Sequence, residues 1–169
     1  EPLDFSYERP SWFSAVGEEC RHTAAAVSIF DQSCFAKFTV EGRDACKVLG
    51  QISAGDVDVE AGRIVYTQWL NERGGIEADV TITRLAADRF MVVTGPASQT
   101  RDLAWLRRHI PDDARAHVAD ASAGLAMLAL MGPQSRDLLA RLSGEDLSNE
   151  AFQFGSAREI EIGYARVLA

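Results

Sequence analysis

One segment, residues 64–83, constrains the fold of this 169-residue chain more than any other. Residues 64–70 are rich in β-branched and aromatic side chains, residues 71–75 are typical of a tight turn, and residues 76–83 alternate apolar with polar side chains. Two strand-like runs joined by a short glycine-containing turn predict a β-hairpin. Because the two strands of a hairpin run antiparallel, the chain needs at least one antiparallel sheet.

The alternating strand presents two different faces, since successive side chains of a strand point in opposite directions. The apolar residues share one face, which we expect to be buried: Ile76, Ala78, Val80 and Ile82. The polar residues share the other: Glu77, Asp79, Thr81 and Thr83. The polar face is either wetted by solvent, as in many antiparallel sheets, or lines a cavity in which the Asp79 carboxylate orients a ligand or accepts a proton. Periodicity alone leaves both interpretations open.

Helices and strands are mixed along the rest of the chain. Hydrophobic spacing and turn residues predict helices over residues 11–27, 45–52 and 98–110 and after Pro133, with Ser11 capping the first. Further strands are predicted over residues 35–40, 89–94, 115–119, 125–130 and 159–167. We expect Leu138, Leu139 and Leu142 to point inward from the last helix. The predicted class is α+β, with helices packed on antiparallel sheets and ferredoxin-like split units.

Composition and charge exclude some functions. The net charge of −8 argues against nucleic acid as a partner, because phosphate binding needs a basic surface. No apolar run approaches the roughly 18 residues that cross a bilayer, and the first residues do not resemble a signal peptide. Without an initiator Met, and with an abrupt end at Ala169, the chain (residues 1–169) is predicted to be the N-terminal portion of a domain of a longer protein.

Thiols, imidazoles and hydroxyls give no catalytic pattern. The chain has three cysteines, Cys20, Cys34 and Cys46. Because their number is odd and their spacing wide, we expect neither a disulfide framework nor a metal site, but buried or half-buried thiols in a reducing compartment. The three histidines are scattered, with no HExxH motif, so no metal centre is predicted. Ser135 has no visible histidine partner, which excludes a serine nucleophile.

Several segments, in order along the chain, resemble the folate-binding T-protein family, the aminomethyltransferases of glycine cleavage and their relatives. The hairpin carries the most specific match, Y-x-x-x-L-N-x-x-G-G-I-x-x-D-V over residues 66–80. Three further matches are AVSIFDQS (residues 26–33), FMVVT (residues 90–94) and ALMGPQSR (residues 129–136). Residues 8–13 and 94–97 resemble the folate domain of dimethylglycine and sarcosine dehydrogenases.

The resemblance implies a site and a reaction. It makes Asp79 the functional acid; many members have two adjacent acids here, but Ala78 occupies the first position. It associates Tyr66 with the folate site, and it places Thr94 near the point where glycine-cleavage enzymes carry an Asn. Implied folate-binding residues are therefore Tyr66, Asp79 and Thr94. The implied reaction moves a one-carbon unit from a methylamine such as dimethylglycine or sarcosine to tetrahydrofolate, with FAD held in another part of the natural protein.

Two other functions are compatible with the same resemblance. One is a non-catalytic module of the same fold that binds folate or serves iron–sulfur cluster assembly. The other is a folate-dependent demethylase acting on a sulfonium, which would use the same acid. The expected partners are tetrahydrofolate and a small methylamine, without nucleic acid or membrane. The expected location is the cytoplasm, or the mitochondrial matrix in a eukaryote.

Overall fold

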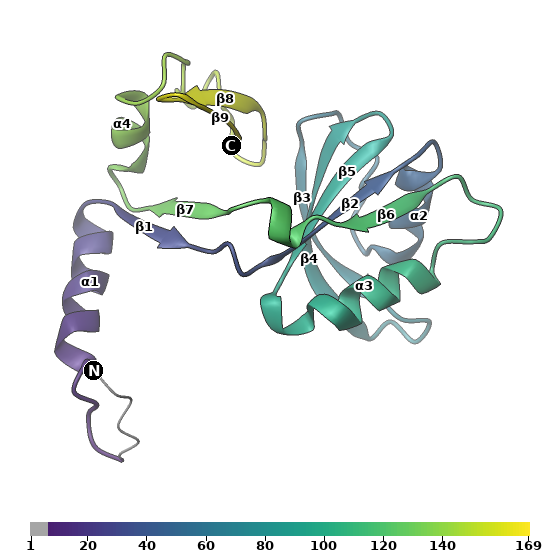
Figure 1. Cartoon of the computed structure of the whole chain (residues 1–169), viewed down its shortest axis with the longest axis horizontal. Helices are drawn as coiled ribbons and strands as arrows, with labels where there is room; N and C mark the ends of the chain where they lie inside the picture. Colours follow the sequence, from purple (N-terminus) through teal and green to yellow (C-terminus); the bar gives the residue numbers. More distant parts are fainter. Residues whose placement is uncertain (1–6) are drawn as a thin grey trace.

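The computed structural model describes residues 7–169, so the first six residues, where no signal peptide was predicted, lie outside it. The helices are α1 (Phe13–Ala25), α2 (Ala45–Ile52), α3 (Gln99–Arg108) and α4 (Ser135–Ala140), with 3-10 turns at Pro96–Ser98 and Ser122–Gly124. The strands are β1 (Ser28–Asp31), β2 (Ala36–Glu41), β3 (Ile64–Leu70), β4 (Ile76–Ala86), β5 (Arg89–Thr94), β6 (His117–Asp120), β7 (Leu128–Met131), β8 (Glu159–Ile162) and β9 (Ala165–Leu168). The predicted α+β class is confirmed (Figure 1).

The centre of the fold is a five-stranded antiparallel sheet in the order β3-β4-β5-β2-β6. Its apolar face packs against α2 and α3, and the buried residues of that layer come from every strand of the sheet. The largest fully buried side chains in the layer are Trp69, Phe38, Phe90, Leu49, Ile82 and Leu106. Burial of these side chains supplies the main stabilising free energy of the sheet.

The predicted hairpin is confirmed as β3 and β4, and the side chain of Asn71 organises its turn. The Asn71 Oδ1 atom accepts hydrogen bonds from the backbone N–H groups of Arg73 (3.0 Å) and Gly75 (2.9 Å). Gly74 has φ +76°, which favours glycine, and a Cβ on Gly75 would lie 2.9 Å from the Asn71 side-chain nitrogen. The turn therefore fixes the register that sets Asp79 directly opposite Gln68.

The other half of the chain forms two small sheets. β1 pairs with β7, and β8 pairs with β9, on the side of the molecule where α1 and α4 lie (Figure 1). A Cβ on Gly132 would lie 2.4 Å from the Ala26 carbonyl oxygen, so glycine permits this close approach between β7 and the end of α1. Backbone hydrogen bonds from Ile64 to Gly155 (2.8 Å) and from Ala157 to Gly62 (2.6 Å) connect this half to the central sheet.

Two predicted helices differ from the structure. α1 starts at Phe13, because Trp12 occupies the N-cap position and no side chain caps the helix; Ser11 lies one residue too early. The predicted inward leucines in and just after α4 are not buried, and Leu138 and Leu142 are exposed. α4 is a six-residue helix, too short to present a continuous apolar face to another element.

Three other expectations are corrected. The predicted strand over residues 159–167 is a hairpin, because Gly163 adopts φ +59° between β8 and β9. Ile76 is 69% exposed rather than buried, since it pairs with Leu70 next to a register shift at the end of the hairpin. All three cysteines are free thiols, but Cys20 and Cys34 are exposed rather than buried or half-buried.

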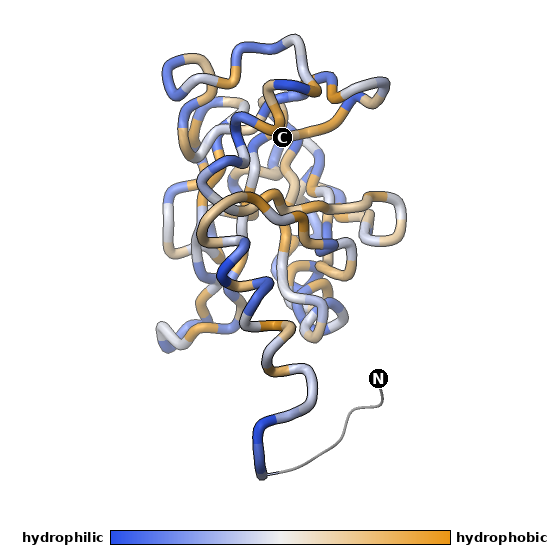
Figure 2. The backbone as a smooth tube through the Cα atoms, turned by 90° about the vertical axis from the view of Figure 1, so that its left-hand side faces the viewer, coloured by the Kyte–Doolittle hydropathy of each residue, from blue (hydrophilic) through white to orange (hydrophobic). Residues whose placement is uncertain are grey.

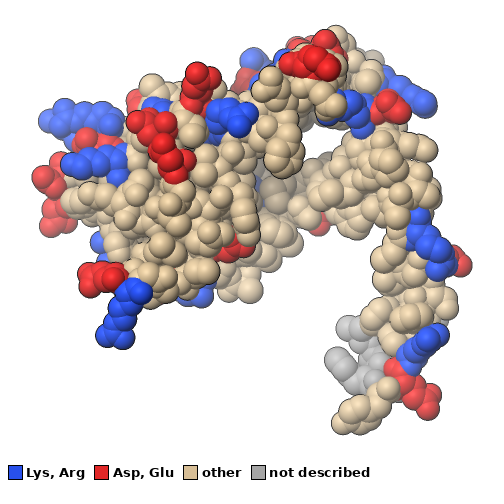
Figure 3. Space-filling model, turned by 180° about the vertical axis from the view of Figure 1, so that it is seen from behind, with Lys and Arg blue, Asp and Glu red and all other residues tan. Residues whose placement is uncertain are grey.

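Charged side chains on the surface and hydropathy along the backbone are both mixed rather than segregated (Figure 2, Figure 3). Lys/Arg and Asp/Glu side chains are interspersed over the face shown in Figure 3. Hydrophobic and hydrophilic residues alternate along most of the backbone (Figure 2). Within residues 7–169, no helix has the length and apolarity that crossing a membrane requires.

Candidate functional site

A hollow of about 390 Å³ brings together all three residues that the sequence resemblance implied. It lies where the polar sides of β3 and β4 meet the end of β5 and the first turn of α3. The lining residues are Phe35, Tyr66, Asp79, Val80, Thr81, Val93, Thr94, Gly95, Ser98 and Arg101. The fold thus brings together side chains that are distant in the sequence, such as those of Tyr66 and Arg101.

Two donors from β3 hold the Asp79 carboxylate. The Tyr66 hydroxyl donates to Asp79 Oδ2 at 2.7 Å, and the Gln68 side-chain amide donates to Oδ1 at 3.2 Å. An ionised carboxylate offers about four lone-pair sites, so each oxygen can still accept from a ligand. The Asp79 side chain is exposed, as a wetted face predicts, but it also lines the hollow, as the cavity interpretation predicts.

Tyr66 responds electrostatically to this arrangement. The hydrogen bond to Asp79 raises the pKa of the Tyr66 hydroxyl, because that bond stabilises the protonated phenol and a phenolate would face the carboxylate. Tyr66 therefore stays a hydrogen-bond donor at neutral pH and fixes the orientation of the carboxylate. Trp69, three residues further along β3, points the other way and is fully buried. Of these two aromatic residues of β3, one is in the core and one is at the site.

Thr94 differs from Tyr66 and Asp79 in its burial and in its hydrogen-bond partner. Its side chain is buried, and its hydroxyl donates to Asp102 Oδ2 at 2.6 Å. Asp102 lies in the first turn of α3 and is itself buried. Thr94 therefore lines the hollow with its hydroxyl proton already engaged, and it joins the end of β5 to the start of α3.

Two lining or supporting residues were not predicted from the sequence. Gln68 follows Tyr66 at strand spacing and stands opposite Asp79, so the alternation of β3 and the hairpin register together contained that signal. Arg101 carries no such local signal. It reaches the hollow only because the turn after β5 folds α3 back along the sheet.

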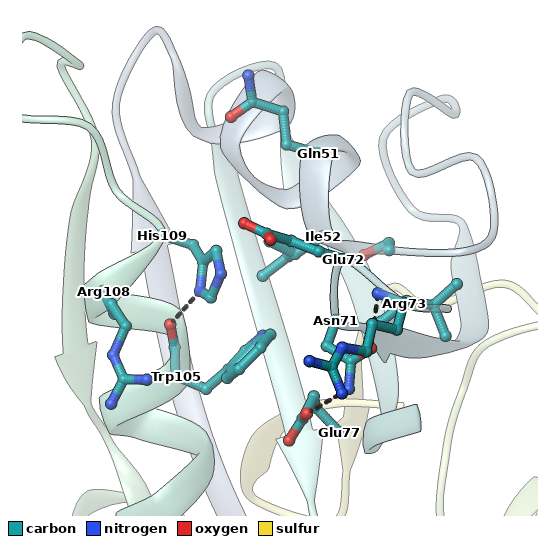
Figure 4. Close-up of a pocket in the computed structure, with 11 residues that line it drawn as sticks. Gln51, Ile52, Asn71, Glu72, Arg73, Glu77, Trp105, Arg108 and His109 are labelled. Carbon is teal, nitrogen blue, oxygen red and sulfur yellow. Dashed lines mark hydrogen bonds between the residues drawn. The ribbon is translucent and has the colours of Figure 1, made fainter. Parts of the chain in front are cut away.

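A second, larger hollow of about 650 Å³ lies near the hairpin turn and contains none of the implied site residues. Trp105 of α3 and His109, which follows the helix, face Arg73 of the turn and Glu77 of β4 across it (Figure 4). Two polar side chains there have structural partners: Glu77 accepts from the Asn71 side chain at 2.8 Å, and a ring nitrogen of His109 lies 2.8 Å from the Trp105 carbonyl oxygen. The Ser53 hydroxyl and the Trp105 indole N–H are buried without a hydrogen-bond partner among the described residues. We place the candidate site in the smaller hollow because Tyr66, Asp79 and Thr94 all line it.

The part of the chain that the structure describes contains no set of side chains that could bind a metal ion. No group of three His, Cys, Asp or Glu side chains there lies close enough to hold a metal ion. The candidate site instead combines one carboxylate acceptor with phenol, amide and guanidinium donors. Such a set recognises a polar, neutral or anionic organic molecule through hydrogen bonds.

The fold and the candidate site define a class of protein: an α+β domain that presents a strand carboxylate to a surface hollow. The sequence model of the family described as "GCVT N-terminal domain" matches residues 2–169. The chain belongs to this family. The predicted kinship with T-protein aminomethyltransferases is thereby confirmed.

Similar proteins agree with this assignment. The chain is 48% identical, over 96% of its length, to 20% of 4-methylaminobutanoate oxidase (formaldehyde-forming) of Paenarthrobacter nicotinovorans. It is 32% identical, over 90% of its length, to 18% of mouse mitochondrial sarcosine dehydrogenase. The crystal structure of glycine cleavage system aminomethyltransferase T from Bartonella henselae superposes with a TM-score of 0.69 at 31% identity, over 83% of this chain and 37% of that one. The chain spans about a fifth of the length of the two enzymes compared by sequence.

Proposed function

We propose that this chain forms the folate-facing, N-terminal portion of an aminomethyltransferase-like domain. In the natural protein it promotes transfer of a one-carbon unit from a methylamine, of the dimethylglycine or sarcosine type, to tetrahydrofolate. The observation that carries the proposal is the Asp79 carboxylate, oriented by Tyr66 and Gln68 and lining a hollow that Thr94 also lines. Relatives named 4-methylaminobutanoate oxidase (formaldehyde-forming) and sarcosine dehydrogenase support the substrate class.

The hollow suits part of a folate molecule. Its volume of about 390 Å³ falls within the range of roughly 300–1,000 Å³ typical of small-molecule sites. Tetrahydrofolate carries ring and amine N–H donors and also carbonyl and carboxylate acceptors. Asp79 can accept from the donors, while the polar groups around it can serve the acceptors. Apolar side chains of Phe35 and Val93 complete the lining.

Asp79 has two tasks in this proposal. When bound, tetrahydrofolate supplies the nitrogen that accepts the one-carbon unit, and that nitrogen must lose a proton. Asp79 accepts a hydrogen bond from the N–H group and helps the proton leave, because a positioned carboxylate is a general base. Tyr66 and Gln68 keep the carboxylate in one orientation, so that it need not reorganise during the reaction. FAD, as the oxidant of the methylamine, would be held by another part of the natural protein.

The test uses the Asp79→Asn variant of the full-length natural protein. Asn keeps the shape of the side chain but cannot accept the proton, so we expect the formation of 5,10-methylenetetrahydrofolate to fall by roughly 100-fold or more. Glu77→Gln is the matched control: Glu77 lies two residues away on β4, and Gln can still accept the hydrogen bond from Asn71. Unchanged product formation in Asp79→Asn would refute the role of this carboxylate.

A further inference from the structure

Arg101 is the cationic residue among the described residues that line the Asp79 hollow. Its side chain is 64% exposed, yet one edge of the guanidinium is fixed. Its Nε and Nη2 atoms each lie 3.0 Å from Asp102 Oδ1. The orientation of Arg101 is therefore set by the start of α3, on the side of the hollow formed by α3 and the end of β5.

The anchor of Arg101 is rigid, because Asp102 is only 1% exposed and uses its other oxygen to accept from Thr94. A buried carboxylate left without a cation is strongly unfavourable, so Asp102 keeps the guanidinium in place. Arg101 has five N–H donors on three nitrogens, and two of these nitrogens, Nε and Nη2, face Asp102. The Nη1 nitrogen makes no hydrogen bond to any of residues 7–169, and its donors are available to a ligand in the hollow.

Arg101 and Asp79 have opposite hydrogen-bonding capacities. An ionised carboxylate only accepts hydrogen bonds, whereas a guanidinium only donates them. A ligand that satisfies both must therefore present N–H donors to one and an acceptor oxygen to the other. Folate has acceptor oxygens at both ends, the 4-oxo group of the pterin and the carboxylates of the glutamyl tail, and one between them, the benzoyl amide oxygen.

We propose that Arg101 is a ligand-binding residue that donates hydrogen bonds to an acceptor oxygen of bound folate while Asp79 accepts from its N–H groups. This inference rests on the proposed function. Charge-assisted hydrogen bonds of a guanidinium to an oxygen are among the stronger polar contacts in proteins, and a planar guanidinium fixed on one edge loses little freedom on binding. The Thr94–Asp102–Arg101 chain would make Thr94 a positioning residue for this contact.

The experiment measures dissociation constants of the full-length natural protein, wild type and Arg101→Gln, for three ligands. They are tetrahydrofolate, tetrahydropteroate, which lacks the glutamyl tail, and the 4-amino analogue of tetrahydrofolate, which lacks the 4-oxo group. We expect Arg101→Gln to weaken tetrahydrofolate binding by about tenfold or more. For the analogue that lacks the contacted oxygen, wild type and variant should bind equally, which identifies the oxygen. Arg89→Gln, an exposed arginine at the other end of β5, removes the same charge and should leave binding unchanged.

Two results would overturn the inference. One is equal tetrahydrofolate binding by wild type and Arg101→Gln. The other is the same loss for all three ligands, which would show that Arg101 contacts neither the 4-oxo group nor the glutamyl carboxylates. Arg101→Lys retains the charge beside Asp102 without the planar fork, so it should recover only part of the affinity. If wild type itself fails to bind tetrahydrofolate, the proposed function fails; if Asp79→Asn loses binding and Arg101→Gln does not, only this inference fails.

Discussion

At the scale of single residues, the candidate site depends on the pair formed by Tyr66 and Asp79. The tyrosine is 68% exposed, and its hydroxyl is committed to the carboxylate at 2.7 Å. Gln68 holds the second oxygen. An exposed acid with two side-chain donors differs from an ordinary solvated acid in having one preferred orientation, and that orientation is what a ligand site needs.

The titration of Tyr66 tests this pair. Because the hydrogen bond to Asp79 raises the pKa of Tyr66 above the ordinary value of about 10, the interaction stabilises the folded chain below about pH 10 and is lost as the pH rises through the raised pKa. In a phenolate absorbance titration, Tyr66 should ionise above the ordinary tyrosine pKa of about 10. Asp79→Asn should lower the pKa of Tyr66. The same pKa of Tyr66 in wild type and Asp79→Asn would show that the bond is absent in solution.

The residues of the site were predictable to different degrees. Asp79 and Tyr66 came from a family motif, while alternation alone allowed a wetted face just as well. Thr94 was implied by position only; its hydrogen bond to a buried Asp102 depends on a helix that begins five residues later. Arg101 enters the hollow through the same tertiary arrangement, which no local pattern encodes.

At the scale of elements, the β3–β4 hairpin is the feature that places Asp79. Periodicity predicted which side chains share a face, and burial of Ala78, Val80 and Ile82 confirms it. The burial that periodicity predicted for Ile76 is wrong, because a period-two pattern contains no information on where the covering helices end. Similarly, the apolar spacing after Pro133 predicted a buried helical face that the short α4 does not have.

The turn can be tested through Asn71. Asn71→Ala removes two hydrogen bonds to the turn backbone and one to Glu77, so we expect the free energy of unfolding to fall by about 1–3 kcal/mol. Chemical denaturation measures this loss. Glu72→Ala, at an exposed position in the same turn, should change stability little. A stability of Asn71→Ala equal to wild type would mean that the glycines alone define the turn.

At the scale of the whole molecule, the chain has one well-packed part and one loosely packed part. The five-stranded sheet with α2 and α3 contains almost all of the buried apolar side chains, whereas α1 buries none of its residues. Exposed apolar side chains gather on α1, β1 and β7, including Phe13, Val16, Ile29, Phe30 and Leu128. Sequence patterns predicted most of these elements, but not the strand order or the unequal packing, because both depend on contacts between distant segments.

Hydrogen exchange of the 169-residue chain should reveal this division. Amides of α1 should exchange quickly, because few buried contacts oppose its local opening, while amides of β2, β4 and β5 should exchange only on global unfolding. Exchange measured by mass spectrometry on peptides from both parts gives the comparison. Protection of α1 equal to that of β4 would contradict the packing described here.

The most direct test of the account is the dissociation constant of tetrahydrofolate for the full-length natural protein and its Asp79→Asn variant. If the Asp79 hollow is the folate site, replacing the charged acceptor should weaken binding by about tenfold or more, since hydrogen bonds to charged groups contribute roughly 1.5–3 kcal/mol. Glu72→Gln, outside the hollow, should bind as wild type does. Identical affinities of wild type and Asp79→Asn would place the folate elsewhere and contradict the central claim.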